Sequence, residues 1–377
     1  MKVALVCDWL TNVGGAEKVL LELHHMYPKA PIYTSKYSKK GIDWFLDTDV
    51  RTGWLQIFPV CFRRILGPLR QRYFSHLDLS EYDLIISVTG AEAKAVKSGK
   101  WLHEHGAKNV KNPKGLHISF CHVPTQYYWQ MYDDYVKNPG FGFLNPIVRC
   151  CFKMIVKPLR RADLEAAAHP DYYVTISEYA KEQIQKYYKR EAFVIHPPVE
   201  IDTFRQGFSG AEDYYIVTSR QVNWKRLDLA IEACLKLKRS LLVVGEGPEH
   251  QRLVKMAGNS DLIIFKPLVE KSELAGLLAR AKGYLFPSME PFGIAPVEAL
   301  AAGCPVVAFG EGGARDYIKD GKNGLLFSKQ TVSSLSETVL KFEKMKFERA
   351  EVAKTAEKFD VERFDKEMRK FVNEKVE

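Results

Sequence analysis

The chain is 377 residues long, which exceeds what a single hydrophobic core usually supports, and its 46% apolar and 27% charged residues are ordinary values for a globular protein. No apolar run reaches the roughly 20 residues of a transmembrane helix. The amino-terminal apolar run ends at Asp8, too early for a signal peptide. The seven cysteines form no C-x-x-C pair and fit reduced thiols better than a disulfide framework or a zinc site. We therefore expect a cytoplasmic protein of two domains.

The formal net charge of +9 is concentrated in two stretches that contain no acidic residue. The first stretch lies between Asp49 and Asp78, and the second lies between Asp134 and Asp163. The first contains Arg51, Arg63, Arg64, Arg70 and Arg72, and the second contains Lys137, Arg149, Lys153, Lys157, Arg160 and Arg161. Such stretches attract polyanions, which include nucleic acid, anionic lipid and phosphorylated substrates.

Short β-branched or aromatic runs alternate with longer helical patterns along the chain, which predicts βα units and parallel sheets. The strands expected in the first half are Val3–Cys7, Pro31–Thr34, Leu84–Val88, His117–Cys121, Tyr172–Ile176 and Phe193–His196. Those in the second half are Tyr215–Ser219, Leu241–Val244, Leu262–Phe265, Tyr284–Phe286 and Pro305–Phe309. The helices between them include Ala16–His25, Glu178–Tyr188, Arg226–Lys238, Lys271–Ala281 and Ala295–Ala302.

The pattern restarts after Pro197-Pro198, because consecutive prolines cannot continue a helix or a central strand. We expect a first domain over residues 1–197 and a second over residues 198–358. Residues 359–377 contain a charged amphipathic helix, Val361–Val376, that should pack back towards the first domain. Its apolar face consists of Phe364, Met368, Phe371 and Val372.

Two features of the first domain follow predicted strands. Gly14 and Gly15 open a helix after the first strand, and glycines let a backbone approach a phosphate or a sugar closely. His122 stands at the carboxyl end of a later strand, where open α/β sheets place their ligands. Taken alone, the glycine pair lacks the three-glycine dinucleotide fingerprint, and a lone histidine is more often structural than catalytic.

In the second domain, Arg220 and Lys225 follow the first predicted strand, and both side chains can face a diphosphate. Without further context they are better explained as solvated surface charges.

The segment Phe286–Val307 is the strongest local signal, because it predicts strand, loop, helix, glycine stop and strand in succession. The free N–H groups of Gly293, Ile294 and Ala295 would point out of the helix amino terminus and form an anion site. Glu290 and Glu298 bracket that terminus, so both can reach a ligand held there. The alternative is an ordinary βαβ crossover with two solvated acids.

Glu290 and Glu298 form an E-x7-E pattern that resembles the family-four retaining glycosyltransferases, and the flanking residues Phe286-Pro287-Ser288 and Ala299–Val307 are similar to theirs. The resemblance implies the GT-B fold, an α/β architecture of two Rossmann-like domains facing each other across a cleft. In this scheme residues 1–197 bind the acceptor and residues 198–358 bind the nucleotide sugar.

The family also implies roles for single residues. Glu298 hydrogen-bonds the ribose, whereas Glu290 and the backbone from Phe292 to Ala295 contact the transferred sugar and the phosphates. Arg220 and Lys225 neutralise the leaving diphosphate. Gly14, Gly15 and His122 lie near the donor phosphate, the sugar and the acceptor. No cofactor and no metal are expected, since the nucleotide sugar is a substrate and the cations with the helix terminus neutralise its diphosphate.

The implied mechanism is front-side attack with retention, in which the departing phosphate oxygen accepts the proton of the acceptor hydroxyl. An oxidoreductase is disfavoured because the chain has neither G-x-G-x-x-G with a ribose acid nor a catalytic dyad. A nucleic-acid binder is disfavoured because no recognition motif accompanies the basic stretches. A phosphorylase would need a longer chain and a cofactor lysine, and a non-catalytic polyanion-binding protein stays an alternative.

The resemblance is greatest to GDP-mannose-dependent mannosyltransferases of O-antigen and phosphatidylinositol-mannoside assembly. It rests on Phe120–Pro124 followed by Tyr127-Tyr128-Trp129, and on Gly312–Arg315. Those enzymes use lipid-linked acceptors at the cytoplasmic membrane face. Base choice is expected near Leu268, where Pro267 replaces the usual glycine, so a UDP-sugar is the rival donor.

The segment from Trp54 to Phe74 interleaves apolar residues with arginines, which suits an interfacial segment. We expect Arg63, Arg64, Arg70 and Arg72 to contact an anionic membrane or the acceptor. The alternative is a core-packed helix with a solvated basic edge.

Overall fold

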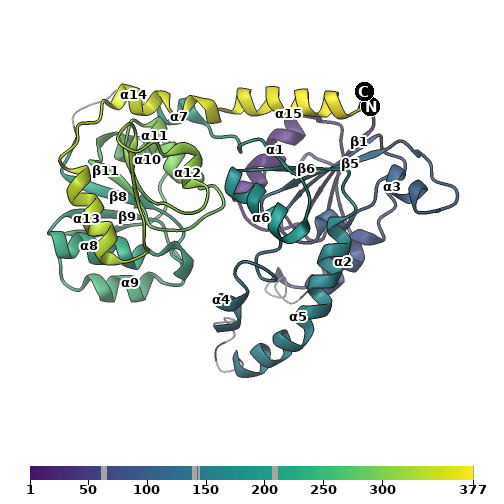
Figure 1. The fold of residues 1–377 in the computed structure, drawn as a ribbon, viewed down its shortest axis with the longest axis horizontal. Helices are drawn as coiled ribbons and strands as arrows, with labels where there is room; N and C mark the ends of the chain where they lie inside the picture. The colour runs from purple at the N-terminus through teal and green to yellow at the C-terminus, as the bar shows by residue number, and fades with distance from the viewer. Residues whose placement is uncertain (61–65, 138–141, 143–144, 206–210, 377) are drawn as a thin grey trace. The chain divides into compact units, whose positions relative to one another are not determined.

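A computed structural model describes residues 1–60, 66–137, 142, 145–205 and 211–376. The chain forms two compact units (Figure 1). Unit 1 comprises Met1–His196 and Asp365–Glu377, and unit 2 comprises Pro197–Phe364. Each unit is built around one parallel sheet.

Unit 1 contains a seven-stranded sheet in the order β3-β2-β1-β4-β5-β6-β7. Its strands are β1 Val3–Cys7, β2 Ile32–Thr34, β3 Val50–Thr52, β4 Leu84–Thr89, β5 Leu116–Cys121, β6 Tyr172–Thr175 and β7 Phe193–Val194. Its α-helices are α1 Gly15–Met26, α2 Gly67–Ser75, α3 Gly99–Glu104, α4 Tyr132–Lys137, α5 Asn145–Ala167 and α6 Glu178–Tyr188, and its 3-10 turns are η1 Trp54–Ile57 and η3 Ala93–Ala95. All residues of β1 and β4 are buried, because a parallel sheet is covered on both faces.

Unit 2 contains a six-stranded sheet in the order β10-β9-β8-β11-β12-β13. Its strands are β8 Tyr214–Thr218, β9 Ser240–Val244, β10 Ile263–Lys266, β11 Gly283–Phe286, β12 Val306–Phe309 and β13 Gly324–Phe327. Its α-helices are α7 Ile201–Phe204, α8 Leu227–Leu237, α9 His250–Ala257, α10 Lys271–Arg280, α11 Ile294–Ala301, α12 Ala314–Tyr317, α13 Val332–Phe342 and α14 Arg349–Lys354, and its 3-10 turns are η5 Asn223–Lys225 and η6 Glu357–Phe359.

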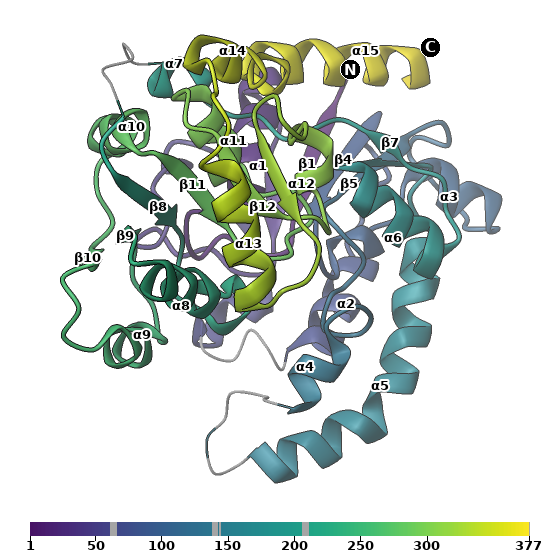
Figure 2. The ribbon, with the colours of Figure 1, turned by 60° about the vertical axis from the view of Figure 1, so that its left-hand side comes forward.

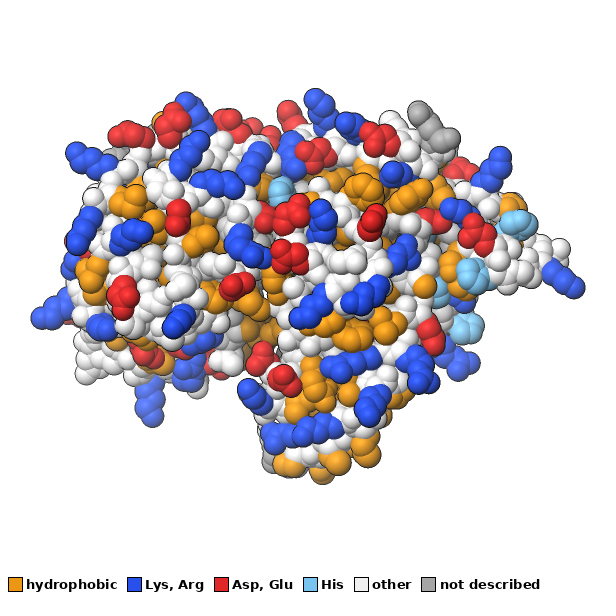
Figure 3. Space-filling view, viewed as in Figure 1, with side chains coloured by type: hydrophobic (Ala, Val, Ile, Leu, Met, Phe, Trp, Pro, Cys, Tyr) orange, Lys and Arg blue, Asp and Glu red, His pale blue; other side chains and the backbone are white. Residues whose placement is uncertain are grey.

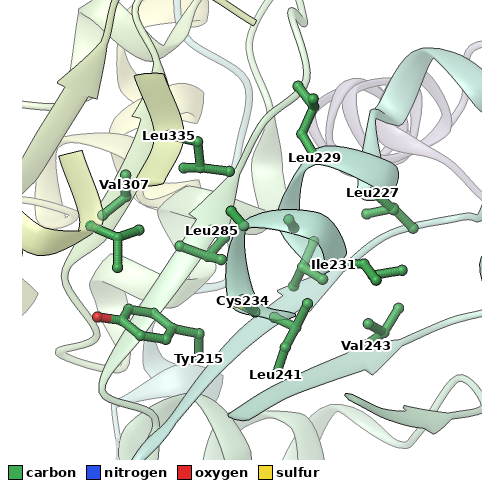
Figure 4. Packing of buried hydrophobic residues seen from close by; sticks show 14 of the residues in the cluster. Tyr215, Leu227, Leu229, Ile231, Cys234, Leu241, Val243, Leu285, Val307 and Leu335 are labelled. Atoms are coloured by element: carbon green, nitrogen blue, oxygen red, sulfur yellow. The ribbon is translucent and has the colours of Figure 1, made fainter. Parts of the chain in front are cut away.

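The core of unit 2 lies between its sheet and the helices α8, α9 and α13. Apolar side chains of α8, such as Leu227 and Ile231, point towards Leu241 and Val243 of β9 (Figure 4). Leu335 of α13 belongs to the same buried cluster. Burial of each such side chain contributes about 1.5–3 kcal/mol, so this layer stabilises the packing of the helices on the sheet.

Helix α15, Val361–Val376, begins in unit 2, and its residues from Asp365 onwards belong to unit 1. The four residues of its predicted apolar face are all buried, as the periodicity predicts. Within unit 1, the ring of Phe371 lies 5.0 Å from the ring of Phe193 at the sheet edge. In the described part of the chain, no helix is both long enough and apolar enough to cross a bilayer.

Both sheets share one topology, in which the order of strands reverses at a central pair. The pair is β1 and β4 in unit 1, and β8 and β11 in unit 2. Chain segments leave this pair in opposite directions, which opens a crevice at the carboxyl ends of the strands, and doubly wound proteins bind ligands there. This topology directs attention to the loops after β8 and β11 and after β1 and β4.

Candidate active site

The loop between β11 and α11 has a backbone shape that only glycine fits. Gly293 caps α11 with φ of 93°, in the region that L side chains rarely adopt. A Cβ atom at this position would lie 2.7 Å from Cζ of Phe286 and 3.0 Å from the hydroxyl of Tyr317. Because a helix leaves its first N–H groups without intrahelical acceptors, the start of α11 offers donors and a positive dipole end to an anion.

Glu290 in this loop meets Lys225 from the segment that follows β8. Oε1 of Glu290 lies 2.5 Å from Nζ of Lys225 and also accepts a hydrogen bond of 2.9 Å from the hydroxyl of Ser288. About one fifth of each charged side chain is exposed, 22% for Lys225 and 20% for Glu290. Two residues predicted from separate motifs therefore form one polar cluster at the switch point, open to a ligand. Ser288, whose contact orients the carboxylate, was not among the predicted site residues.

Arg220 is exposed at the end of β8 and lies over the ring of Trp224, 5.9 Å from its centroid. The loop that carries Arg220 is locked by Gln221, which is buried and donates from Nε2 to the carbonyl of Gly245 at 2.6 Å. A Cβ atom on Gly247, where φ is 159°, would lie 2.3 Å from the carbonyl oxygen of Gln221. The glycines after β9 thus allow two loops to touch and hold the Arg220 backbone in place.

Two buried tyrosines fix the backbone next to the Lys225–Glu290 cluster. The hydroxyl of Tyr284 in β11 donates to the carbonyl of Thr218 in β8 at 3.0 Å, which joins the two strands at the switch point. The hydroxyl of Tyr317 donates to the carbonyl of Phe292 at 2.9 Å, which fixes the loop that precedes α11. Burial raises the pKa of both phenols above the ordinary value, so both stay protonated donors.

The other predicted donor-site residues of unit 2 differ in their surroundings. Glu298 lies in the second turn of α11 and is half-buried. Leu268 follows β10 and is 79% exposed, two strands away from β8. The side chain of Phe292 is buried against Tyr317 and Phe359, so only the backbone of this residue can contact a ligand. The prediction for Phe292 concerned its backbone, and the buried ring leaves that prediction open.

In unit 1, Gly14 and Gly15 open α1 after β1. Gly14 is the cap residue with extended backbone, and Gly15 is the first residue of the helix. Asp8, directly after β1, was not among the predicted site residues. The Asp8 carboxylate is buried and accepts hydrogen bonds from Thr89 and from the N–H groups of Gly90 and Ala93. Burial and the nearby Glu92 raise its pKa. These bonds tie the ends of β1 and β4 together.

His122 follows β5 and forms an edge-to-face contact with Phe120, with 5.7 Å between ring centroids. Its Nε2 atom is buried and has no hydrogen-bond partner among the described residues. Burial lowers the pKa of the imidazole to about 4, so the ring is neutral at pH 7. A neutral ring with an unpartnered nitrogen suits a hydrogen bond to a ligand, whereas it does not suit charge stabilisation by an imidazolium.

Asp163 of α5 anchors the loop after His122. The side chain is fully buried and accepts four hydrogen bonds. The donors are Lys94 at 2.6 Å, Thr125 at 2.7 Å, Trp129 at 2.7 Å and Tyr188 at 2.9 Å. These donors lie 25 to 69 residues away from Asp163 in the sequence, so no local pattern could reveal the cluster.

The predicted membrane-contacting arginines do not form one exposed surface. Arg70 is buried, and its Nε donates to the carboxylate of Glu92 at 2.8 Å, so its assignment to a membrane or acceptor surface is wrong. A buried guanidinium needs such a partner, which lies 22 residues further along the chain. Arg72 is exposed on α2. Arg63 and Arg64 lie outside the described residues.

The structure thus brings Lys225 and Glu290 into contact and places Arg220, Gly293–Ala295 and Glu298 on the same two strand ends of unit 2. Gly14, Gly15 and His122 belong to unit 1, where β4 separates β1 from β5. Over the described ranges, no group of three or more histidine, cysteine or carboxylate side chains is arranged to hold a metal ion.

The sequence of unit 2 matches a known family. Residues 199–359 match the model of glycosyl transferases group 1. A D-inositol 3-phosphate glycosyltransferase of Frankia alni is 33% identical over 174 residues, which cover 39% of this chain and 43% of the relative. An uncharacterised glycosyltransferase of Methanocaldococcus jannaschii is 27% identical over 178 residues, which cover 46% of this chain and 50% of the relative. The chain therefore matches half or less of the length of these curated relatives.

The fold is similar to solved structures over the whole chain. HepE from Anabaena, in complex with UDP, superposes with a TM-score of 0.70 and 18% identity, covering 99% of this chain and 100% of HepE. Together with the two parallel sheets, this similarity shows the GT-B fold of glycosyltransferases. The prediction of an α/β protein with two Rossmann-like domains is confirmed.

Proposed function

We propose that this protein is a retaining glycosyltransferase that moves a hexosyl unit from a nucleotide sugar to a lipid-linked or glycan acceptor. Unit 2 binds the donor in this proposal, and unit 1 binds the acceptor. The observation that carries it is the contact of Lys225 with Glu290 at the switch point, beside the amino terminus of α11. These groups lie at two neighbouring strand ends. The cation and the free N–H groups suit the diphosphate of a nucleotide sugar, and the carboxylate suits the hydroxyl groups of its sugar.

The proposed roles follow from charge. Arg220 and Lys225 bind the diphosphate, with the first N–H groups of α11 as further donors. A bound diphosphate competes with Glu290 for Lys225, which frees the carboxylate to accept hydroxyl groups of the sugar. Glu298 accepts the ribose hydroxyls, and neutral His122 orients the sugar.

In the proposed reaction the acceptor oxygen attacks the anomeric carbon on the face from which the diphosphate departs. The bond from carbon to phosphate oxygen breaks, the new glycosidic bond forms, and the acceptor proton passes to the departing phosphate oxygen. The protein contributes positioning and stabilisation of the charge that develops on the diphosphate. This scheme requires no cofactor and no metal ion, and full activity in excess chelator is the expected result.

We propose GDP-mannose as the donor, on the resemblance of Phe120–Pro124, Tyr127-Tyr128-Trp129 and Gly312–Arg315 to the corresponding segments of mannosyltransferases. The second candidate is a UDP-sugar, because HepE, of the same fold, binds UDP. Isothermal titration with GDP and UDP distinguishes them. We expect GDP to bind more tightly, whereas UDP tighter by tenfold, about 1.4 kcal/mol, would replace the donor and leave the reaction class intact.

For the acceptor we propose a lipid-linked glycan at the cytoplasmic face of the membrane, with the protein bound there peripherally. The support is the resemblance together with the basic stretches of unit 1.

A thermal-shift screen of nucleotide sugars tests the donor site first. A ligand at 100 times its dissociation constant stabilises the protein by about 2.7 kcal/mol. Stabilisation by nucleotide sugars, together with nucleotide release in the presence of membrane lipid, supports the enzyme. Stabilisation by polyanions such as heparin alone would instead support a non-catalytic polyanion-binding protein.

A further inference from the structure

Helix α5 presents an apolar face to solvent, which is the reverse of what a surface helix usually does. The exposed fractions are 62% for Ile147, 66% for Met154 and 46% for Ile155. Cys151 and Pro158 are also exposed. Positions 147, 151, 154 and 158 follow helical spacing, so these side chains form one stripe along the outside of the helix. We call these four residues the apolar stripe.

The opposite face of α5 is the one that packs on unit 1. Val156 and Asp163 are buried there, and the ring of Phe152 lies 5.6 Å from the ring of Tyr132 in α4, tilted by 39°. The basic residue Arg160 also belongs to this packed face, where its Nε donates to the carbonyl of Tyr128 at 2.7 Å. The apolar stripe is therefore not a core surface, since the core of unit 1 lies on the other side of the helix.

Three further basic residues run along one edge of the apolar stripe. Lys153, Lys157 and Arg161 are exposed, and they recur every four residues, one helical turn apart. None of them has an ion-pair partner among the residues that the structure describes. No acidic residue occurs between Asp134 and Asp163, and the next exposed acid of α5 is Glu165, one turn beyond Arg161. We call these three residues the basic row.

The position of α5 leaves this surface accessible within unit 1. Figures 1 and 2 both show the amino-terminal part of α5 extending away from the sheet of unit 1, with α4 beside it. The space-filling view shows hydrophobic side chains gathered at the end of this projection, with lysine and arginine side chains next to them (Figure 3). An apolar band bordered by cations on a projecting helix is the pattern of an interfacial helix.

We propose that α5 docks unit 1 on an anionic lipid bilayer, with the apolar stripe inserted at the level of the headgroups and the basic row on the lipid phosphates. A second copy of the chain fits less well, because an isologous contact through the apolar stripe would bring two basic rows together. This membrane contact lies in a different segment from the one predicted between Trp54 and Phe74. The role of this docking surface, which is to give access to a lipid-linked acceptor, rests on the proposed function.

The test is flotation of the full chain with phosphatidylcholine vesicles, with and without phosphatidylglycerol. We expect binding to the anionic vesicles that weakens as salt is raised. The variant K153Q/K157Q/R161Q should bind them on the order of 100-fold more weakly, at about fivefold per residue. The variant I147Q/M154Q should lose about tenfold or more.

Matched controls change the same chemistry elsewhere. K236Q/K255Q/K341Q removes three exposed lysines from unit 2, and V254Q/L340Q replaces two exposed apolar residues there. Both should bind vesicles as the wild type does. All substitutions are at exposed positions, so the thermal unfolding midpoint should not move.

Three results would overturn the proposal. They are wild-type protein that fails to float with anionic vesicles, α5 variants that bind as tightly as their controls, and a dimer in solution that I147Q/M154Q dissociates. Titration of GDP and UDP in the same samples distinguishes failure of the docking surface from failure of the proposed function. Nucleotide binding with no vesicle binding rejects the docking surface alone, whereas vesicle binding without nucleotide binding rejects the donor site alone.

Discussion

Replacing Gly293 with alanine tests whether the start of α11 is held in one conformation. The added methyl group must adopt φ of 93°, which costs about 1–2 kcal/mol for an L residue. It would also lie 2.7 Å from Cζ of Phe286 and 3.0 Å from the Tyr317 hydroxyl. Neither neighbour can yield easily, because Phe286 and Tyr317 are 4% and 1% exposed and the hydroxyl is bonded to Phe292. Overpacking of this kind adds about 1–3 kcal/mol.

The expected loss of unfolding free energy for Gly293→Ala is therefore about 2–5 kcal/mol, the sum of the two contributions. Gly258→Ala is the matched control, since Gly258 ends α9 with φ of 60° and its added methyl group meets nothing within 4 Å. The control should show the backbone contribution alone. Urea unfolding measures both variants, and Gly293→Ala should lose about 1–3 kcal/mol more than Gly258→Ala because of the added steric contact.

Nucleotide affinity gives the second measurement for Gly293→Ala. If the loop moves to relieve the contact, the first N–H groups of α11 move with it, and titration should show nucleotide binding weakened by about tenfold or more. Gly258→Ala should bind as the wild type does. A Gly293→Ala variant that matches Gly258→Ala in stability and the wild type in affinity would refute the constraint on this loop.

Four further results are expected. Lys225→Ala should reduce turnover by about 100- to 1,000-fold without loss of folding, because one donor to the leaving diphosphate is removed; steady-state rates beside the exposed Lys236→Ala control check this, and equal rates would exclude Lys225. Glu298→Ala should weaken binding of the free nucleoside diphosphate, and unaltered affinity by titration would exclude contact with ribose. The His122 ring should titrate by NMR near pH 4, because burial lowers its pKa below the value of about 6.5 in an unfolded chain. Its contribution to stability is therefore present above about pH 6.5 and is lost as the pH falls towards 4. A midpoint near 6.5 would contradict its burial. Asp163→Ala should cost about 3–5 kcal/mol of unfolding free energy, because a buried lysine loses its partner, and a loss below about 1 kcal/mol would contradict the cluster.

The sequence predicts strands well where both faces are buried. Val3–Cys7 is found with the predicted bounds, and Leu84–Val88 is extended by one residue, because continuous apolar runs bounded by turns are unambiguous. Val50–Thr52 was not predicted, since it is an edge strand whose residues are exposed or half-buried. Gly324–Phe327 was also not predicted; it is the edge strand β13 of the sheet in unit 2.

Contacts between segments that are far apart in the chain could not be predicted from the sequence. The motifs named Lys225 and Glu290 separately, but their ion pair depends on β8 and β11 being neighbours across the switch point. Arg70 was assigned to the surface because no acid is near it in the sequence, yet its partner Glu92 is supplied by a loop after β4. The exposed stripe on α5 depends on which face of the helix packs, which periodicity alone does not determine.

The most direct test of the central claim is nucleotide release from GDP-mannose incubated with the full chain and membrane lipid, with the anomer of the product assigned by NMR. We expect GDP release matched by an α-linked mannosyl product, with both strongly reduced in Lys225→Ala. Release from a UDP-sugar with retained configuration would change only the donor. A folded protein that releases nucleotide from no nucleotide sugar, or a product of inverted configuration, would contradict the account.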